Sequence, residues 1–128
     1  MKARILVTGS RHWTDEAALA SAMVRALRWL WPEKGQQGVV LVHGAAKGAD
    51  QMAARLAAQH GWEVEAHPAD WGAHGKGAGP QRNQAMVDAG ADILLVCPVP
   101  GSRGTWDCMK RAVEAGIPVY VVNPKEGR

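Results

Sequence analysis

The sequence predicts an α/β fold, in which one parallel five-stranded β-sheet carries helices on both faces. Short β-branched runs alternate with longer helical patterns along the chain. Four of the five strand candidates are almost continuously apolar, as expected for strands that are covered on both sides. The connections between strands and helices are short, which favours parallel strands joined by right-handed crossovers.

The five predicted strands are Arg4–Thr8, Val39–His43, Glu63–Ala66, Ile93–Cys97 and Val119–Val122, and all but the third are nearly continuous apolar runs. Pro118 can begin the last one, because the first residue of a strand need not donate to the ladder. We expect the strand order 3-2-1-4-5, which makes the chain a Rossmann-like three-layer domain.

Four helices are expected between the strands. The first has the acidic pair Asp15 and Glu16 in its first turn, and its apolar residues repeat at helical spacing as far as Leu30. The other three are predicted at about Ala49–His60, Gln81–Asp88 and Thr105–Ala115, each followed closely by a glycine. The segment His67–Pro80 is expected to be a long irregular loop, and loops of that length are often functional.

The length and composition fit one globular domain, which we expect at residues 1–124 with a short tail at 125–128. The chain has 128 residues, of which 47% are hydrophobic and 21% charged. It contains neither an apolar run of the roughly 20 residues that span a bilayer nor a signal peptide, so we expect a cytoplasmic protein without membrane contact. Cys97 and Cys108 are the only cysteines and are expected to be reduced thiols.

The charge suits a small anionic ligand better than nucleic acid. The net charge of +3 is mildly basic, and no run of five cations or basic helical stripe occurs. The predicted loops do carry separate cations: Arg11, Lys47, Lys76, Arg82 and Arg103. Five cations at one rim would favour a phosphate group.

Glycine-rich turns follow the first, second and fourth strands. The carboxyl ends of parallel strands share one edge of the sheet, and ligands bind there where the strand order reverses, between strands one and four. Such turns let a phosphate approach the backbone and a helix N-terminus. The predicted ligand-binding residues are Gly9, Ser10, Arg11, Gly44, Lys47, Gly48, Asp50, Arg82, Asn83, Gly101, Ser102, Arg103, Gly104 and Thr105. Neither a G-x-x-x-x-G-K-[ST] loop nor a first-turn G-x-G-x-x-G occurs, which argues against ordinary NAD binding.

Several of these residues have a structural reading beside the functional one. Thr105 is expected to cap the fourth helix, and its hydroxyl can also hold a phosphate. Asp50 either caps the second helix or binds a ribose hydroxyl or a base. Arg82 lies just inside a predicted helix N-terminus, a poor place for a cation, which favours a ligand contact. Cys108 is read as a buried apolar residue rather than as a nucleophile.

The aromatic and imidazole side chains give weaker signals. Three tryptophans lie near the predicted rim, where they either pack loops or stack on a nucleobase: Trp13, Trp71 and Trp106. Three histidines lack the spacing of metal ligands: His43, His67 and His74. We therefore expect neither a metal site nor a cofactor.

Five segments together resemble the SLOG superfamily, named for the Smf/DprA and LOG proteins, and specifically its YspA-like branch. They are Val7–Arg11, His43–Asp50, Pro68–Trp71 with His74-Gly75, Gly79–Met86 and Gly101–Trp106. The resemblance runs almost end to end. It implies a Rossmann-like fold that binds nucleotides or nucleotide-derived ligands.

The chain more distantly resembles the LOG enzymes, which cleave the N-glycosidic bond of nucleoside 5′-monophosphates. Their signature P-G-G-x-G-T-x-x-E is matched in part, with Ser102 at the second glycine and Cys108 at the catalytic glutamate. Arg82 matches the arginine of the preceding R-K-x-x-M segment. This resemblance makes Arg82 and Asp107, one residue before the glutamate position, the candidate catalytic residues.

Three functions follow as hypotheses. The first is a non-catalytic module that binds or senses a nucleotide or an ADP-ribose-like molecule. The second is a nucleotide N-glycosidase in which Asp107 or Asp50 stabilises an oxocarbenium-like ribose while Arg82 holds the phosphate. The third, single-stranded nucleic-acid binding as in the DprA relatives, is disfavoured by the lack of a cationic stripe. LOG-like relatives are commonly dimers, so a homodimer or higher homo-oligomer is expected, with Trp29 and Trp31 as a possible contact surface.

Overall fold

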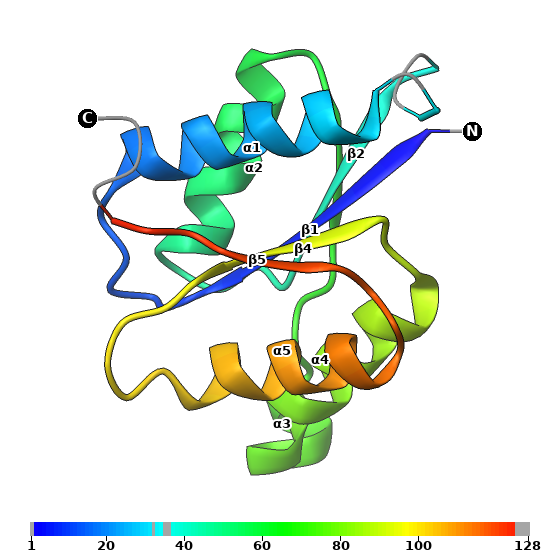
Figure 1. The fold of residues 1–128 in the computed structure, drawn as a ribbon. Helices are drawn as coiled ribbons and strands as arrows, with labels where there is room; N and C mark the ends of the chain where they lie inside the picture. Colours follow the sequence, from blue (N-terminus) through cyan, green and yellow to red (C-terminus); the bar gives the residue numbers. More distant parts are fainter. Residues whose placement is uncertain (1, 32, 35–36, 125–128) are drawn as a thin grey trace.

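Five parallel strands form one sheet in the order β3-β2-β1-β4-β5, as predicted (Figure 1). The structure is a computed structural model that describes residues 2–31, 33–34 and 37–124. The predicted tail at residues 125–128 lies outside the described residues. β1 is central and pairs with both β2 and β4, so the strand order reverses between β1 and β4.

The strand bounds agree closely with the predicted ones: β1 Ala3–Gly9, β2 Val39–His43, β3 Glu63–Ala66, β4 Ile93–Cys97 and β5 Val119–Val121. β1 is one residue longer than predicted at each end, because Ala3 pairs with Val39 and Gly9 with Cys97. β5 ends one residue earlier than predicted. β2 and β4 are buried along their whole length, as their continuous apolar runs indicate.

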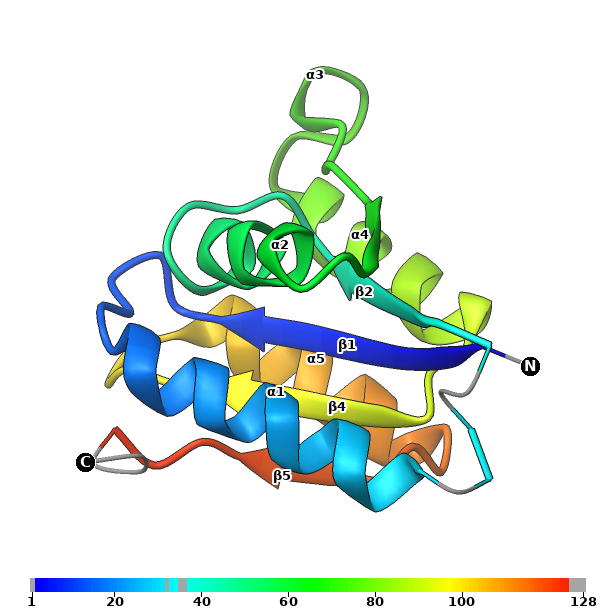
Figure 2. The same ribbon diagram turned by 90° about the horizontal axis from the view of Figure 1, so that it is seen from above.

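The helices cover the sheet on both sides and make three layers (Figure 2). α1 (Glu16–Leu30) and α2 (Ala49–Gln59) lie on one face, and α4 (Ala78–Ala89) and α5 (Arg103–Glu114) on the other (Figure 1). Asp15 caps α1, since its carboxylate accepts the Ala18 amide at 3.1 Å.

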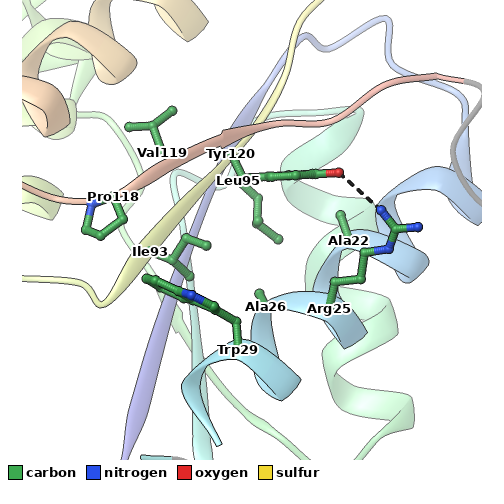
Figure 3. A pocket seen from close by; sticks show the side chains of 9 residues that line it. All are labelled: Ala22, Arg25, Ala26, Trp29, Ile93, Leu95, Pro118, Val119 and Tyr120. Carbon is green, nitrogen blue, oxygen red and sulfur yellow. Dashed lines mark hydrogen bonds between the residues drawn. The ribbon is translucent and has the colours of Figure 1, made fainter.

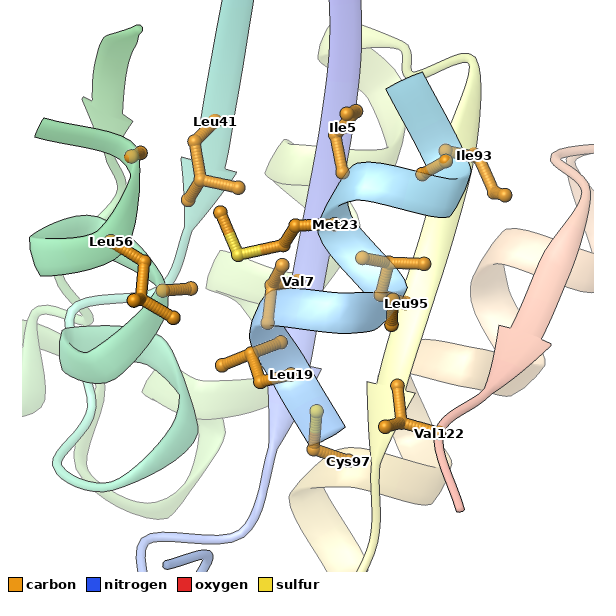
Figure 4. Close-up of a cluster of buried hydrophobic side chains, with 14 of the residues drawn as sticks. Ile5, Val7, Leu19, Met23, Leu41, Leu56, Ile93, Leu95, Cys97 and Val122 are labelled. Carbon is orange, nitrogen blue, oxygen red and sulfur yellow. The ribbon is translucent and has the colours of Figure 1, made fainter. Parts of the chain in front are cut away.

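Each helix layer packs its own hydrophobic cluster against the sheet. On the α1–α2 side, Leu19 and Met23 of α1 meet Val7 of β1 and Leu95 of β4 (Figure 4). On the other side, Met86 of α4 belongs to the second cluster. Both clusters follow from apolar faces that the sequence repeats at helical spacing. Among the described residues, no helix combines the length and the apolarity needed to cross a bilayer.

The segment predicted as an irregular loop is largely helical, so that expectation was wrong. It contains the short helix α3 (Trp71–His74), the 3₁₀ turn η1 (Gly75–Gly77) and the start of α4. Asp70 caps α3, because its Oδ1 accepts the Ala73 amide at 3.0 Å. α4 begins at Ala78 rather than at residue 81, with Pro80 in its first turn, where the missing proline N–H costs no hydrogen bond.

Candidate functional site

A cavity of about 400 Å³ opens at the carboxyl ends of β1 and β4, where the strand order reverses. Its walls come from the β1–α1 loop, the β4–α5 loop with the first turn of α5, and the side of α4. Asp50 in the first turn of α2 and Trp71 of the short helix α3 (Trp71–His74) complete the lining of the cavity. The structure therefore brings three of the predicted loop regions to one place.

Most of the predicted ligand-binding residues line this cavity: Gly9, Ser10, Arg11, Asp50, Arg82, Asn83, Gly101, Ser102, Arg103, Gly104 and Thr105. Gly44, Lys47 and Gly48 are not among its lining residues, and neither is Lys76. Three of the five cations that were expected at one rim thus meet there. The positive charge comes from three separate arginines.

The lining also includes His12 and Met86, which the predicted ligand-binding set left out, and Trp71, which was considered for the rim. Met86 stands four residues after Arg82 on α4, so helical spacing placed both on one face. That signal was available once the helix was assigned.

The glycines beside the cavity mainly let segments of the chain approach one another. A Cβ on Gly9 would lie 2.5 Å from the Ala49 Cβ, and one on Gly48 would lie 2.5 Å from the Ser10 carbonyl oxygen. These two positions were interpreted as places where a phosphate nears the backbone, yet protein atoms occupy the space. Gly104 is different, because a Cβ there would meet nothing within 4 Å.

Asp50 does not cap α2, so the interpretation of it as the helix cap was wrong. Gly48 holds the N-cap position, and the Asp50 Oδ2 accepts the amides of Gly44 at 2.9 Å and Ala46 at 3.4 Å. The carboxylate thus braces the β2–α2 loop from inside. Its Oδ1 is buried and accepts no hydrogen bond from any residue that the structure describes.

The Asp50 carboxyl has an unusual proton affinity for an aspartate. Burial raises its pKa to about 6, and the hydrogen bonds from the loop amides and the charge of Arg82 offset only part of that rise. The side chain is 4% exposed. The cavity therefore contains a buried acceptor that changes charge near neutral pH.

Arg82 and Asn83 hold the walls of the cavity together. Arg82 lies in the second turn of α4 rather than just inside its N-terminus, so, contrary to the prediction, its position in the helix does not by itself indicate a ligand contact. Its Nη1 donates to the Gly44 carbonyl and its Nε donates to the Asn83 Oδ1 at 2.9 Å. The Asn83 amide in turn donates to the Gly104 carbonyl at 3.2 Å and to Asp107 at 2.9 Å. These bonds join α4 to both the β2–α2 loop and α5.

The first turn of α5 presents backbone amides to the cavity. Ser102 holds the N-cap position, three residues earlier than expected, so Thr105 is the third helical residue and not the cap. The Ser102 hydroxyl bonds with the backbone of Val99 instead of capping. In the described part of the chain, the amides of Gly104 and Thr105 therefore find no acceptor. Free amides and the positive helix end favour an anion here.

Neither Asp107 nor Cys108 is placed for chemistry in the cavity. Asp107 is not a lining residue, and its Oδ2 accepts from Arg111 Nε and Asn83, each at 2.9 Å. Burial opposes its ionisation, but these two hydrogen bonds together with the charges of Arg111 and Lys110 hold the pKa of Asp107 below its usual value. Cys108 is completely buried, and burial raises the pKa of its thiol to about 11. This position agrees with the prediction that Cys108 is a buried apolar residue.

The three tryptophans considered for the rim have different roles. Trp13 is buried, and its Nε1 donates to the Asp15 carbonyl at 3.0 Å, so it packs the β1–α1 loop. Trp106 is exposed but lies outside the lining. Trp71, on α3, lines the cavity while 60% exposed. Only Trp71 of the three has a free face at the cavity.

A second hollow of about 320 Å³ lies between α1 and the β4–β5 edge (Figure 3). Its lining is almost entirely apolar, and Arg25 donates to the Tyr120 hydroxyl across it at 3.4 Å. Trp29 borders this hollow and is 61% exposed, and Trp31 is 46% exposed. The expected oligomer stays a prediction.

No group of three His, Cys, Asp or Glu side chains among the described residues is arranged to hold a metal ion. Burial is the main cause that lowers the pKa of His43, with His67 and Arg82 adding to it.

Comparisons with known proteins agree with this architecture. The model of the family described as "YspA, cpYpsA-related SLOG family" matches residues 3–74. The Gene 61 protein of Mycobacterium phage D29 is 46% identical over 121 residues, which cover 91% of this chain and 93% of that protein.

Two solved structures share the fold. DNA processing protein A (DprA) from Streptococcus pneumoniae superposes with a TM-score of 0.67 at 21% identity, over 98% of this chain. The chain spans only about half of the DprA chain, 53%. The protein TM1055 superposes with a TM-score of 0.64 at 16% identity, over 93% of this chain and 72% of its own.

Proposed function

Because the chain belongs to the YspA, cpYpsA-related SLOG family, we propose that its cavity binds a nucleotide or a nucleotide-derived phosphorylated ligand, as a binding or sensing module. One observation carries this proposal. The free amides of the first turn of α5 share a single cavity with three arginines and a buried carboxylate. Such a cavity offers both an anion site and an acceptor for a hydroxyl or an amine.

The phosphate belongs at the first turn of α5. Gly104 and Thr105 line the cavity, their amides have no acceptor in the described part of the chain, and the helix dipole adds positive charge. Arg103, on the exposed rim, supplies a guanidinium that can bind phosphate in a bidentate manner. The open space at Gly104 leaves room for the anion beside the backbone.

The rest of the ligand has room and an aromatic neighbour. A volume of about 400 Å³ falls in the range of small-molecule sites, roughly 300–1,000 Å³. The exposed face of Trp71 provides a surface on which a nucleobase can stack. A nucleoside monophosphate carries a group for each of these sites, a phosphate for the amides and a base for Trp71.

A nucleotide N-glycosidase is the alternative that one observation favours. Asp50 places a carboxylate at the cavity, where it can stabilise positive charge that develops on a ribose. Asp107, the other candidate, is engaged with Arg111 and Asn83 instead. If the chain hydrolyses nucleotides, Asp50 is therefore the residue to substitute.

The test combines binding with turnover. The protein is incubated with nucleoside 5′-monophosphates and ADP-ribose, while thermal shift and the release of free base are followed. We expect a thermal shift without base release. If the wild-type protein releases free base and Asp50→Ala does not, the chain is a hydrolase rather than a binding module.

A matched pair of variants locates the site. Arg103→Gln removes a cation from the lining and should weaken binding about tenfold, the typical worth of a charged hydrogen bond. Lys47→Gln removes an exposed cation outside the lining and should leave the affinity unchanged. Tight binding of oligonucleotides alone, falling steeply with salt, would instead support nucleic-acid binding.

A further inference from the structure

One oxygen of the Asp50 carboxyl lacks a partner in the described part of the chain. Oδ2 accepts the amides of Gly44 and Ala46, whereas the buried Oδ1 accepts nothing. The side chain borders the cavity although only 4% of it is exposed. A buried acceptor without a donor is unfavourable, so a site that keeps one is expected to receive a donor from outside the chain.

The position of Asp50 indicates which part of a nucleotide supplies that donor. Asp50 lines the same cavity as Trp71 and the first turn of α5. The proposed function assigns the phosphate to the first turn of α5 and the base to the exposed face of Trp71. Because the sugar joins the phosphate to the base, it is the part of the nucleotide that remains to meet Asp50.

We infer that Asp50 Oδ1 accepts a hydrogen bond from a ribose hydroxyl, so that the cavity selects ribonucleotides over deoxyribonucleotides. This inference rests on the proposed function. A sugar hydroxyl suits the position because it is a rotatable donor, whereas the ionised carboxylate is an acceptor only. A hydrogen bond to an ionised group is also stronger than one between neutral groups.

The test compares ligands that differ by one hydroxyl. Dissociation constants are measured by calorimetry for the four ribonucleoside 5′-monophosphates and for their 2′-deoxy and 3′-deoxy forms. For the wild-type protein, at least one deoxy form should bind roughly tenfold to a hundredfold more weakly than its parent. The phosphate and the base are the same in each pair, so the ratio reports on the hydroxyl.

Two aspartate variants separate recognition from a structural role. In Asp50→Asn, the amide oxygen can still accept the loop amides, but the charged acceptor is gone, so the ratio should fall towards one. Asp88→Asn changes an exposed aspartate of α4 outside the lining and should keep the wild-type ratio. If Asp50 only braces the loop, Asp50→Asn changes the affinities for both ligands equally.

The ratio should also shrink as the pH falls below about 6, because burial raises the pKa of Asp50 to about 6 and a protonated carboxyl is a weaker acceptor. Arg82 faces the carboxyl from α4. The thiols of Cys97 and Cys108 have pKa values raised to about 12 and 11 by burial and remain neutral in this range. His12 also lines the cavity, and its effect on binding is the same for the ribo and deoxy forms of one nucleotide, so it does not change the ratio.

Two results would overturn the inference in different ways. Equal affinity for ribo and deoxy forms would overturn it while leaving the proposed function intact. An absence of binding by every nucleotide would overturn both. A ratio that Asp50→Asn does not change would show that another group reads the hydroxyl.

Discussion

Replacing Asp50 by asparagine should stabilise the protein at neutral pH. The asparagine side chain resembles the protonated carboxyl, and its oxygen can accept the amides of Gly44 and Ala46 in place of Oδ2. It removes the cost of holding a negative charge in a buried position. The substitution therefore separates the charge of Asp50 from its role in the loop.

The size of the effect follows from the shift in pKa. Burial raises the pKa of Asp50 from 3.8 to about 6, so the folded protein binds its proton more tightly than the unfolded chain does. Stability is then highest below the unfolded pKa, declines as the pH rises through this window, and levels off above about pH 6. The destabilisation by the ionised carboxyl comes to about 3 kcal/mol near pH 7.5 and about 1 kcal/mol near pH 4.5.

Urea unfolding of the wild type and Asp50→Asn, at about pH 7.5 and about pH 4.5, measures both values. The variant should gain about 2 kcal/mol more at the higher pH than at the lower one. Asp88→Asn serves as the control, because it changes an exposed aspartate and should give no such difference. A gain from Asp50→Asn that is the same at both pH values, or a loss at neutral pH, would refute the burial argument.

The remaining predictions concern the glycines, the tryptophans and the assembly. Gly9→Ala should lower the unfolding free energy by about 1–3 kcal/mol, because the new Cβ would lie 2.5 Å from the Ala49 Cβ of α2. In Gly104→Ala the new Cβ meets nothing within 4 Å, so this variant should keep the wild-type stability, and chemical unfolding of both variants checks the difference. Trp71→Ala should weaken nucleotide binding by roughly 1–3 kcal/mol, whereas Trp106→Ala, outside the lining, should leave the affinity unchanged. Calorimetry measures both affinities, and equal losses would contradict stacking on Trp71. If the chain self-associates through the exposed end of α1, Trp29→Lys should lower the mass seen by light scattering, and an unchanged mass would exclude that surface.

The sheet was predictable because its signals are local. The bounds of β2, β3 and β4 agree with the predicted bounds, and a parallel sheet follows from the alternation of strands and helices. The region before α4 was harder to predict. The loop was expected to run to Pro80 and the helix to begin at Gln81, yet proline in a first turn gives up no helical hydrogen bond, so α4 begins before it at Ala78.

The site was predictable as a region but not atom by atom. The topology alone brings the loops after β1 and β4 to one edge, and Arg11 and Arg103 do line one cavity there. A sequence does not tell whether a glycine makes room for a ligand or for another part of the chain. Gly9 and Gly48 do the latter. The same limit applies to Asp107, which the distant enzyme pattern favoured and a pair of hydrogen bonds holds away from the cavity.

An amide NMR titration tests most directly whether the cavity at the ends of β1 and β4 is a nucleotide site. The nucleoside 5′-monophosphate that gives the largest thermal shift is added to ¹⁵N-labelled protein. We predict saturable shifts of the Gly104 and Thr105 amides, with smaller ones around Asp50. Shifts confined to the hollow beside Trp29, or no saturable shift at all, would contradict the account.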